Sequence, residues 1–286
     1  MSALVNLEDW ISSEGLRPGE SRFRQAVSII LNAIESSSAL SNLMVIKGGV
    51  LMALRYHSIR YTRDMDFSTE MSLDNLNKDE FEKTFRKALT LASADSPYDL
   101  ECRIQSFTHE PKNQDQASFP SIQIKIGYAG RGKPEHKGLL RGRATNVIKI
   151  DFSLNEIIVT EEVIEISGGK TIRAYAFSDM VAEKLRSLLQ QPLRKRYRRQ
   201  DVYDLCLLID KNCSDDEKNA ILTALVSKSK SRGLNPDQDS MSHPEIRRRA
   251  SEDYHTLSDE VGGVLPDFDT SFDTVESFYK SLPWPG

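Results

Sequence analysis

The chain has 286 residues, of which 39% are hydrophobic and 28% are charged, and its formal net charge is -4. These values are typical of a globular protein of one or two domains with a real core. No apolar run reaches the roughly 18 residues of a spanning helix, and the N-terminus lacks the apolar block of a signal peptide, so we expect a cytoplasmic protein. The three cysteines, Cys102, Cys206 and Cys213, lack zinc-site spacing and are expected to be free thiols.

The N-terminal part of the chain mixes helical and strand patterns. Apolar residues recur at intervals of three and four over residues 20–38 and 77–92, which predicts two amphipathic helices. Between these helices, a short buried strand is expected at 43–46 and a second strand at 64–67. A helix that begins at a pair of glycines is expected to connect the two strands.

Strand patterns dominate the middle of the chain and helical patterns its end. Alternating apolar residues predict three strands, at residues 98–108, 121–128 and 146–152. The Gly-, Lys- and Arg-rich segment 127–143 is predicted to be a flexible loop. Further helices are predicted at 178–190, 200–211, 214–229 and 270–281, with an exposed loop at 231–245. We therefore expect an α/β (α+β) fold of two domains, residues 1–176 and 177–286.

A glycine pair precedes two aspartates that are spaced two residues apart. Gly48 and Gly49 could let the backbone approach a phosphate at a helix N-terminus, or could simply form a tight turn. Lys47, just before them, could contact a phosphate or be a solvated charge. In a strand, Asp64 and Asp66 project from one face with their α-carbons about 6.6 Å apart. Such a pair can share one metal ion or bridge two Mg²⁺ ions.

Two residues further along the chain could join this site. Asp151 faces away from its apolar neighbours, so it is either a polar residue on the wet face of a strand or a third metal ligand. Lys184 borders the apolar stripe of its helix, where its ammonium group could extend into solvent or bind a triphosphate.

A second group of charges surrounds the start of a later helix. Asp201 and Asp204 lie three apart on one helical flank, where they could pair with arginines or position a substrate or metal. The preceding run RKRYRR is either a solvated surface or, with Tyr197 interleaved, a contact for the phosphates and bases of RNA. Its five positive charges in six positions belong to Arg194, Lys195, Arg196, Arg198 and Arg199.

The order of these motifs resembles the AbiEii family of nucleotidyltransferase-like toxins, which includes the MenT toxins. The segments that carry the resemblance are KGG-VLMALRY, TRDMDFS, IKIDFSL, AEKLRSLL and RRQDVYDL, within residues 20–212. The resemblance implies a polymerase-β-like nucleotidyltransferase core with a mixed sheet, followed by a helical C-terminal domain. It also implies a toxin of a bacterial toxin–antitoxin or phage-defence pair that has a cognate antitoxin.

Such a toxin would use an NTP and Mg²⁺ to modify RNA, and the tRNA acceptor end is the target of some family members. In the implied site, Asp64 and Asp66 bind Mg²⁺. The phosphates are bound by Gly48, Gly49 and Lys184. Gly49 stands where many relatives have serine, which removes a hydroxyl group that could bond a phosphate.

The acceptor hydroxyl would be oriented or deprotonated by a further carboxylate, which is either Asp151 or one of Asp201 and Asp204. Asp151 also resembles the third metal carboxylate of the wider superfamily. Two other functions could use the same groups. A phosphotransferase would pass a γ-phosphate to a protein or small molecule, and a catalytically silent relative would bind nucleotide, RNA or a protein without turnover.

Overall fold

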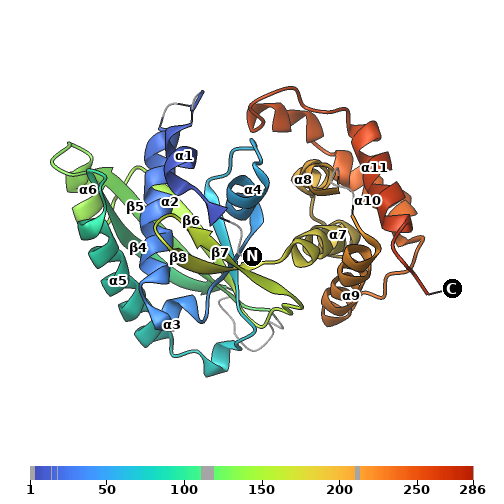
Figure 1. Ribbon diagram of the computed structural model, residues 1–286, viewed down its shortest axis with the longest axis horizontal. Coiled ribbons are helices and arrows are strands. Elements are labelled where there is room, and N and C mark those ends of the chain that lie inside the picture. The colour runs from blue at the N-terminus through green and yellow to red at the C-terminus, as the bar shows by residue number, and fades with distance from the viewer. Residues whose placement is uncertain (1–3, 14, 18, 111–118, 210–212, 286) are drawn as a thin grey trace. The chain divides into compact units, whose positions relative to one another are not determined.

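The computed structural model describes residues 4–13, 15–17, 19–110, 119–209 and 213–285. The chain forms two compact units, whose elements are labelled in Figure 1. Unit 1 comprises residues 1–55, 63–156 and 162–174, and unit 2 comprises residues 56–62, 157–161 and 175–286. The two short segments 56–62 and 157–161 therefore belong to the unit that contains the C-terminal helices.

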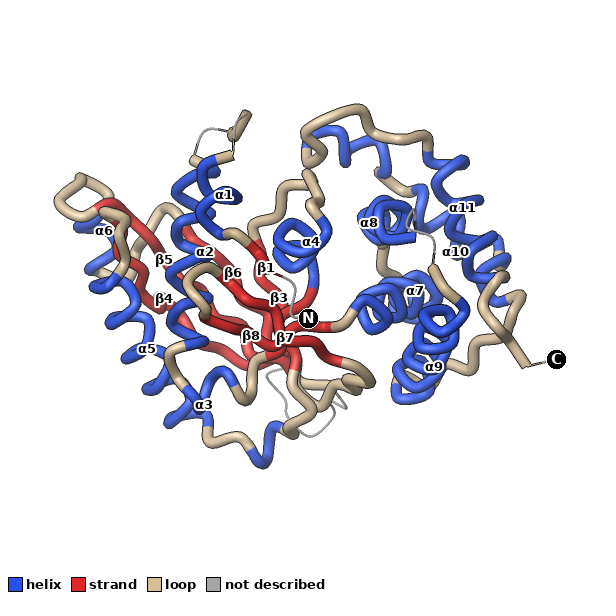
Figure 2. Tube along the Cα trace, viewed as in Figure 1, coloured by secondary structure: helices blue, strands red, loops and turns tan. Residues whose placement is uncertain are grey.

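Unit 1 is built on one eight-stranded sheet with the strand order β1-β7-β8-β2-β3-β6-β5-β4 (Figure 2). The strands are β1 (Leu4–Val5), β2 (Val45–Lys47), β3 (Asp64–Ser68), β4 (Leu100–Glu110), β5 (Ser121–Gly130), β6 (Val147–Ser153), β7 (Glu161–Ile166) and β8 (Lys170–Tyr175). β3 runs parallel to β6 and antiparallel to β2, so the sheet is mixed. The predicted α/β fold with a mixed sheet is confirmed.

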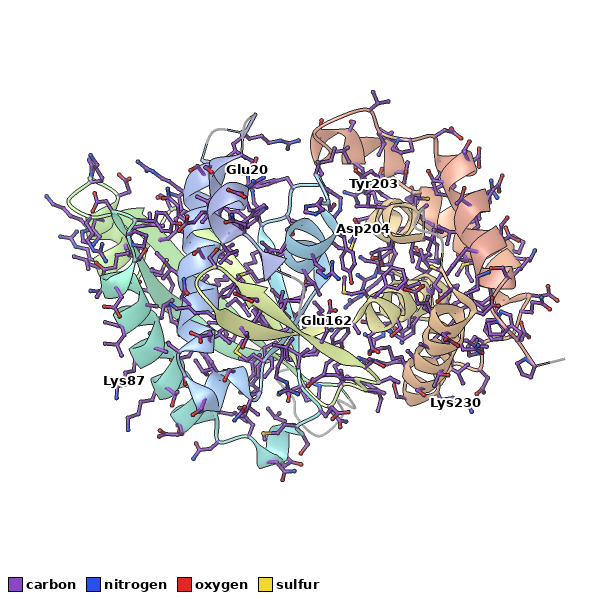
Figure 3. The ribbon with its side chains drawn as sticks, in the orientation of Figure 1. Glu20, Lys87, Glu162, Tyr203, Asp204 and Lys230 are labelled. Atoms are coloured by element: carbon purple, nitrogen blue, oxygen red, sulfur yellow. The ribbon has the colours of Figure 1, made fainter. Side chains whose placement is uncertain are left out.

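The helices of unit 1 are α1 (Leu7–Ser12), α2 (Glu20–Glu35), α3 (Ser38–Ser41), α4 (Gly48–Tyr56), α5 (Lys78–Asp95) and α6 (His136–Leu140). α2 and α5 cover the apolar face of the sheet (Figure 1). The ring of Phe81 on α5 stacks on Phe152 of β6, with centroids 5.3 Å apart. Lys87 of α5 is exposed and points away from the sheet (Figure 3). Because side chains alternate along a strand, the polar residues of β3, β5 and β6 occupy the opposite face.

Unit 2 is helical, as predicted. Its helices are α7 (Phe177–Arg194), α8 (Arg199–Ile209), α9 (Asp215–Ser231), α10 (Pro244–Ser251) and α11 (Phe268–Lys280). A buried ion pair, Asp179 to Lys228 at 2.9 Å, connects α7 with α9. Asp179 also accepts hydrogen bonds from the backbone N–H groups of Val159 and Thr160. These bonds explain why residues 157–161 fold with the helices.

Four predicted segments differ from the structure. The segment 127–143, predicted to be a flexible loop, begins as the end of β5 and contains α6, whose Leu139 is buried. The predicted loop 231–245 contains a 3-10 turn at Ser240–Ser242 and the start of α10. The strand predicted at 43–46 lies at Val45–Lys47, and α7 continues past residue 190 to Arg194. Residues 210 and 211, predicted to end a helix, lie outside the described residues.

The three cysteines are free thiols, as predicted, and burial raises the pKa of Cys102. None of the helices in the described ranges has the length and apolar character that crossing a lipid bilayer requires.

Candidate active site

The aspartates of the DxD motif and Asp151 meet on the polar face of the unit 1 sheet. Asp66 pairs with Asp151 across the parallel β3–β6 ladder and with Lys47 across the antiparallel β2–β3 ladder. Directly opposed residues share a face, and adjacent strands lie about 4.8 Å apart. Lys47, Asp66 and Asp151 therefore form one row across three strands. Asp64 projects from the same face one row away, opposite Lys149.

The glycine motif contacts this row directly. Gly48 has a φ of +70°, a left-handed conformation that favours glycine. A Cβ atom at this position would lie 2.0 Å from Oδ2 and 2.7 Å from Cγ of Asp66. The carboxylate of Asp66 thus packs against the backbone at the start of α4. Only glycine allows both this conformation and this close approach.

We expect Gly48→Ala to displace the Asp66 carboxylate and to abolish nucleotidyl transfer. The variant combines the strain of a left-handed alanine with a clash, and each costs roughly 1–3 kcal/mol. Gly132 is a matched control, because its φ is +69° and nothing lies within 4 Å of the position that a Cβ atom would take there. Gly132→Ala carries the same strain without the clash. Urea unfolding and transfer rates should therefore show a loss in Gly48→Ala that clearly exceeds the loss in Gly132→Ala, and equal losses would contradict the prediction.

The charges of this row and of the neighbouring Asp64 suit a cation. Burial raises the pKa of Asp64; the charge of Lys149 lowers it and that of Asp151 raises it further. Oδ1 of Asp151 and the hydroxyl of Ser68 on β3 are buried, and neither has a hydrogen-bond partner among the described residues. An orphaned carboxylate oxygen beside two further carboxylates is a group that a hard cation would satisfy.

The carboxylates do not form a complete metal cage. Within the described ranges, no group of three or more Asp, Glu, His or Cys side chains is arranged to hold a metal ion. Mg²⁺ in NTP-dependent enzymes is commonly held by one or two carboxylates, with substrate phosphates and water completing its shell. The residues present therefore fit an ion that binds together with a triphosphate.

Lys47 is a buried cation at one end of the row. Its ammonium nitrogen lies 3.9 Å from the carboxylate of Glu156, which is also buried. Sequence analysis did not identify Glu156, because it follows β6 without a strand or helix pattern of its own. Lys47 brings a positive charge next to Asp66, just before the glycine motif, and Glu156 offsets part of that charge.

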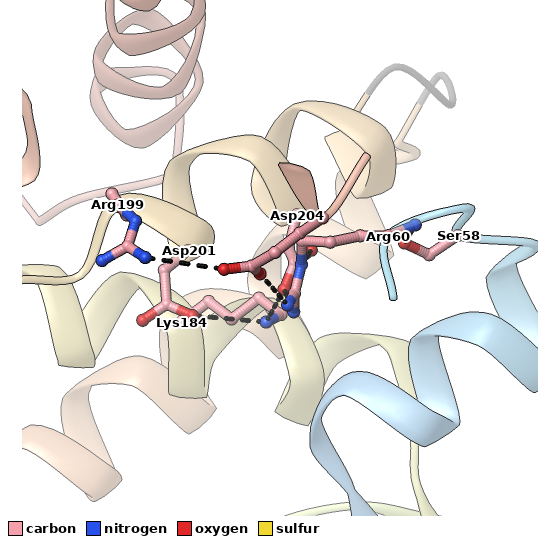
Figure 4. A network of polar contacts seen from close by, with 7 residues as sticks. Ser58, Arg60, Lys184, Arg199, Asp201 and Asp204 are labelled. Atoms are coloured by element: carbon pink, nitrogen blue, oxygen red, sulfur yellow. Dashed lines mark hydrogen bonds and ion pairs between the residues drawn. The ribbon is translucent and has the colours of Figure 1, made fainter. Parts of the chain in front are cut away.

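The remaining predicted site residues lie in unit 2, where three of them meet in a buried network (Figure 4). Lys184 of α7 donates to Asp204 at 2.7 Å and to Asp201 at 3.3 Å, both on α8. Arg60 makes two parallel bonds to Asp204, at 3.0 and 2.9 Å, and an ion pair with Glu260 at 3.2 Å. The network thus joins residues 56–62 to two helices of the unit.

The charges of this network stabilise one another. Burial opposes ionisation of Asp204, but Lys184 and Arg60 outweigh it and lower the pKa of this carboxyl. Burial likewise opposes the charge of Lys184, but Asp204 and Asp201 outweigh it and raise the pKa of this lysine. Sequence analysis missed Arg60, because residues 58–63 have neither a helix nor a strand pattern and were interpreted only as a polar link between two elements.

The basic run occupies the connection between α7 and α8. Arg194, Lys195 and Arg196 are exposed, whereas Arg199 is half-buried and lies 3.5 Å from Glu260. Burial lowers the pKa of Arg194, and nearby arginines, first among them Arg232, lower it further. The exposed part of the run is therefore a site of concentrated positive charge.

The sequence of the chain matches a known protein family, and its fold matches solved structures. A family profile described as "Nucleotidyl transferase AbiEii toxin, Type IV TA system" matches residues 29–276. The crystal structure of a candidate nucleotidyltransferase from H. pylori is 14% identical, with a TM-score of 0.51, and the alignment covers 93% of this chain and 96% of that chain. The crystal structure of JHP933 from Helicobacter pylori has the same identity, 14%, and TM-score, 0.51, and covers 94% of this chain and 93% of that chain. No curated protein matches the sequence.

Proposed function

The chain belongs to the AbiEii family of nucleotidyl transferase toxins of type IV toxin–antitoxin systems, and we propose that it transfers nucleotides from an NTP to RNA. Family membership makes the protein a nucleotidyltransferase with a nucleotide substrate and an antitoxin partner. We further propose the tRNA 3′ acceptor end as the target, Mg²⁺ as the cofactor, phage defence as the biological role and the cytoplasm as the place of action.

One observation carries this proposal. Gly48, Asp66 and Asp151 come from three separate parts of the sequence, and strand register and close packing bring them together. The arrangement combines a helix start that can approach phosphates with carboxylates on adjacent strands. Metal-assisted transfer of a nucleotidyl group requires both parts.

Each candidate site residue of unit 1 has a part in the proposed reaction. Asp64 and Asp66, with Asp151, would hold Mg²⁺, which when bound neutralises the charge of the triphosphate. The backbone N–H groups at Gly48 and Gly49 bind phosphate oxygens, and Lys47 adds a positive charge to that side. The acceptor hydroxyl would be oriented or deprotonated by a further carboxylate, either Asp151 or one of Asp201 and Asp204.

In unit 2, two roles are proposed. Lys184 is proposed as a phosphate-binding residue, and in the structure Asp201 and Asp204 hold its ammonium group. The basic run at Arg194, Lys195, Arg196, Arg198 and Arg199 contacts the RNA backbone.

The direct test incubates the protein with total RNA, Mg²⁺ and each NTP in turn, labelled at the α-phosphate, and sequences the RNA ends. We expect nucleotides added to RNA 3′ ends, with tRNA as the main product. A label transferred only from the γ-phosphate to a protein or small molecule would instead show phosphotransfer. Nucleotide binding without a labelled product would show a silent relative.

A further inference from the structure

Two lysines oppose each other on the polar face of the sheet, next to the carboxylates. Lys125 of β5 pairs with Lys149 of β6 across the antiparallel ladder, and Lys149 pairs with Asp64 of β3. Both lysine side chains are exposed. The row Asp64, Lys149 and Lys125 therefore extends from the DxD strand across the two neighbouring strands.

Lys125 faces a like charge and has no carboxylate directly opposite it in the sheet. Like charges directly opposite each other in a sheet are destabilising. The charge of Lys149 acts on Asp64, whose pKa it lowers. The other neighbour of Lys125 across the sheet is Ser106 of β4, which has no charge. A bound anion would offset the repulsion between the two ammonium groups.

The strand order indicates which anion this is. Gly48 follows β2 on one side of the DxD strand, whereas β6 and β5 lie on the other side. In phosphoryl-type transfer, the attacking and leaving oxygens lie roughly in line on opposite sides of the phosphorus atom. If the triphosphate binds at the glycine motif, the acceptor approaches over β6 and β5. Lys125 and Lys149 then face the acceptor and not the leaving pyrophosphate.

We propose that Lys125 and Lys149 together bind a backbone phosphate of the acceptor RNA strand, close to its reacting hydroxyl. This inference rests on the proposed function, because it takes the glycine motif as the NTP side of the site. Lysine is a compact point charge without the fork geometry that reads a base, so the pair positions the strand and does not select its sequence.

The test compares Lys125→Ala/Lys149→Ala with wild type in RNA binding and in nucleotide transfer. We expect the Kd and the KM for RNA to rise about tenfold. The KM for NTP should stay unchanged in the single variant Lys125→Ala, which leaves Lys149 opposite Asp64. The slope of log Kd against log salt should fall by about 0.7, because the two lysines contact one phosphate and each single-strand phosphate contact contributes about 0.7. Lys87→Ala is the matched control, because Lys87 is an exposed lysine on the helix layer that covers the opposite face of the sheet.

A further variant separates charge from other effects of the substitution. Lys125→Arg/Lys149→Arg keeps both positive charges and should restore RNA affinity. The single variant Lys125→Ala removes only the lysine that has no opposed carboxylate, and it should already weaken RNA binding without changing the pH dependence of transfer.

The outcomes distinguish this inference from the proposed function. If wild type transfers nucleotides and the double alanine variant keeps the RNA affinity and salt slope of wild type, the lysine pair has no such role. If wild type binds RNA without transfer and the double variant loses that binding, the lysine pair does bind RNA but the proposed activity fails. If wild type neither binds nor modifies RNA, both are overturned.

Discussion

Asp66→Asn is expected to lower the rate of nucleotidyl transfer about a thousandfold or more while the protein stays folded. Asp66 is the central residue of its row, with Lys47 on one side and Asp151 on the other. Asparagine has nearly the same shape, so it should keep the packing against Gly48. It lacks the charge, however, and an amide oxygen is a much weaker ligand than a carboxylate for the Mg²⁺ ion that binds with the triphosphate.

Initial rates of labelled nucleotide incorporation measure this effect, and circular dichroism checks the fold. Asp74→Asn is a suitable control, because Asp74 is an exposed aspartate of the same unit outside the sheet. Its transfer rate should equal that of wild type. If Asp66→Asn transferred nucleotides at more than about a tenth of the wild-type rate, Asp66 would not bind the metal and the catalytic centre would lie elsewhere.

The elements that sequence analysis predicted well are those whose pattern reflects burial on a single face. In β5, the alternating isoleucines Ile122, Ile124 and Ile126 are completely buried, so the period of two identifies the strand. Asn77 caps α5 by accepting the N–H of Glu80, which is a purely local signal. Such patterns depend on neighbours in sequence and can be found without a structure.

The end of α7 shows a limit of this reasoning. Pro192 removes the N–H group that would bond the carbonyl of Leu188, and the sequence therefore favours a helix end before it. In the structure, the side-chain amide of Gln191 donates to that carbonyl at 3.2 Å. A side-chain amide thus takes the place of the missing backbone donor, and the helix continues to Arg194. Helix propensities describe single residues and do not include such a bond between a side chain and the backbone.

The strands β7 and β8 were missed for a different reason. Gly168 and Gly169 both have positive φ values, +80° and +77°, which is typical of the tight turn of a hairpin. The glycine pair was therefore a usable signal. The alternation beside it was obscured by charged residues and by Val163, which is 47% exposed.

The candidate site was predictable in its residue types and not in its contacts. The three aspartates of unit 1 could be selected because strand periodicity places them away from the apolar face. The packing of Asp66 against Gly48 could not be derived, since it depends on the turn between β2 and α4. Arg60 could not be found either, because its partners Asp204 and Glu260 lie 144 and 200 residues away in the sequence.

Asp204→Ala is expected to lower the free energy of unfolding by about 3–5 kcal/mol, because it leaves Lys184 and Arg60 buried without their main partner. The Asp204 side chain has no solvent exposure. Asp201 makes a single, longer contact with Lys184, at 3.3 Å, so Asp201→Ala serves as the control and should cost clearly less. Urea unfolding of both variants gives the comparison.

The effect of Asp204→Ala should depend on pH in a defined direction. Because the folded-state pKa of Asp204 is lowered, the stability that its charge contributes is fully present above the unfolded-state pKa of about 3.9. It is lost as the pH falls through the folded-state pKa. The difference in unfolding free energy between wild type and Asp204→Ala should therefore be constant near neutral pH and shrink below about pH 4. A variant that unfolded like wild type but no longer transferred nucleotides would show instead that Asp204 acts on the substrate, and that its ion pairs contribute little to folding.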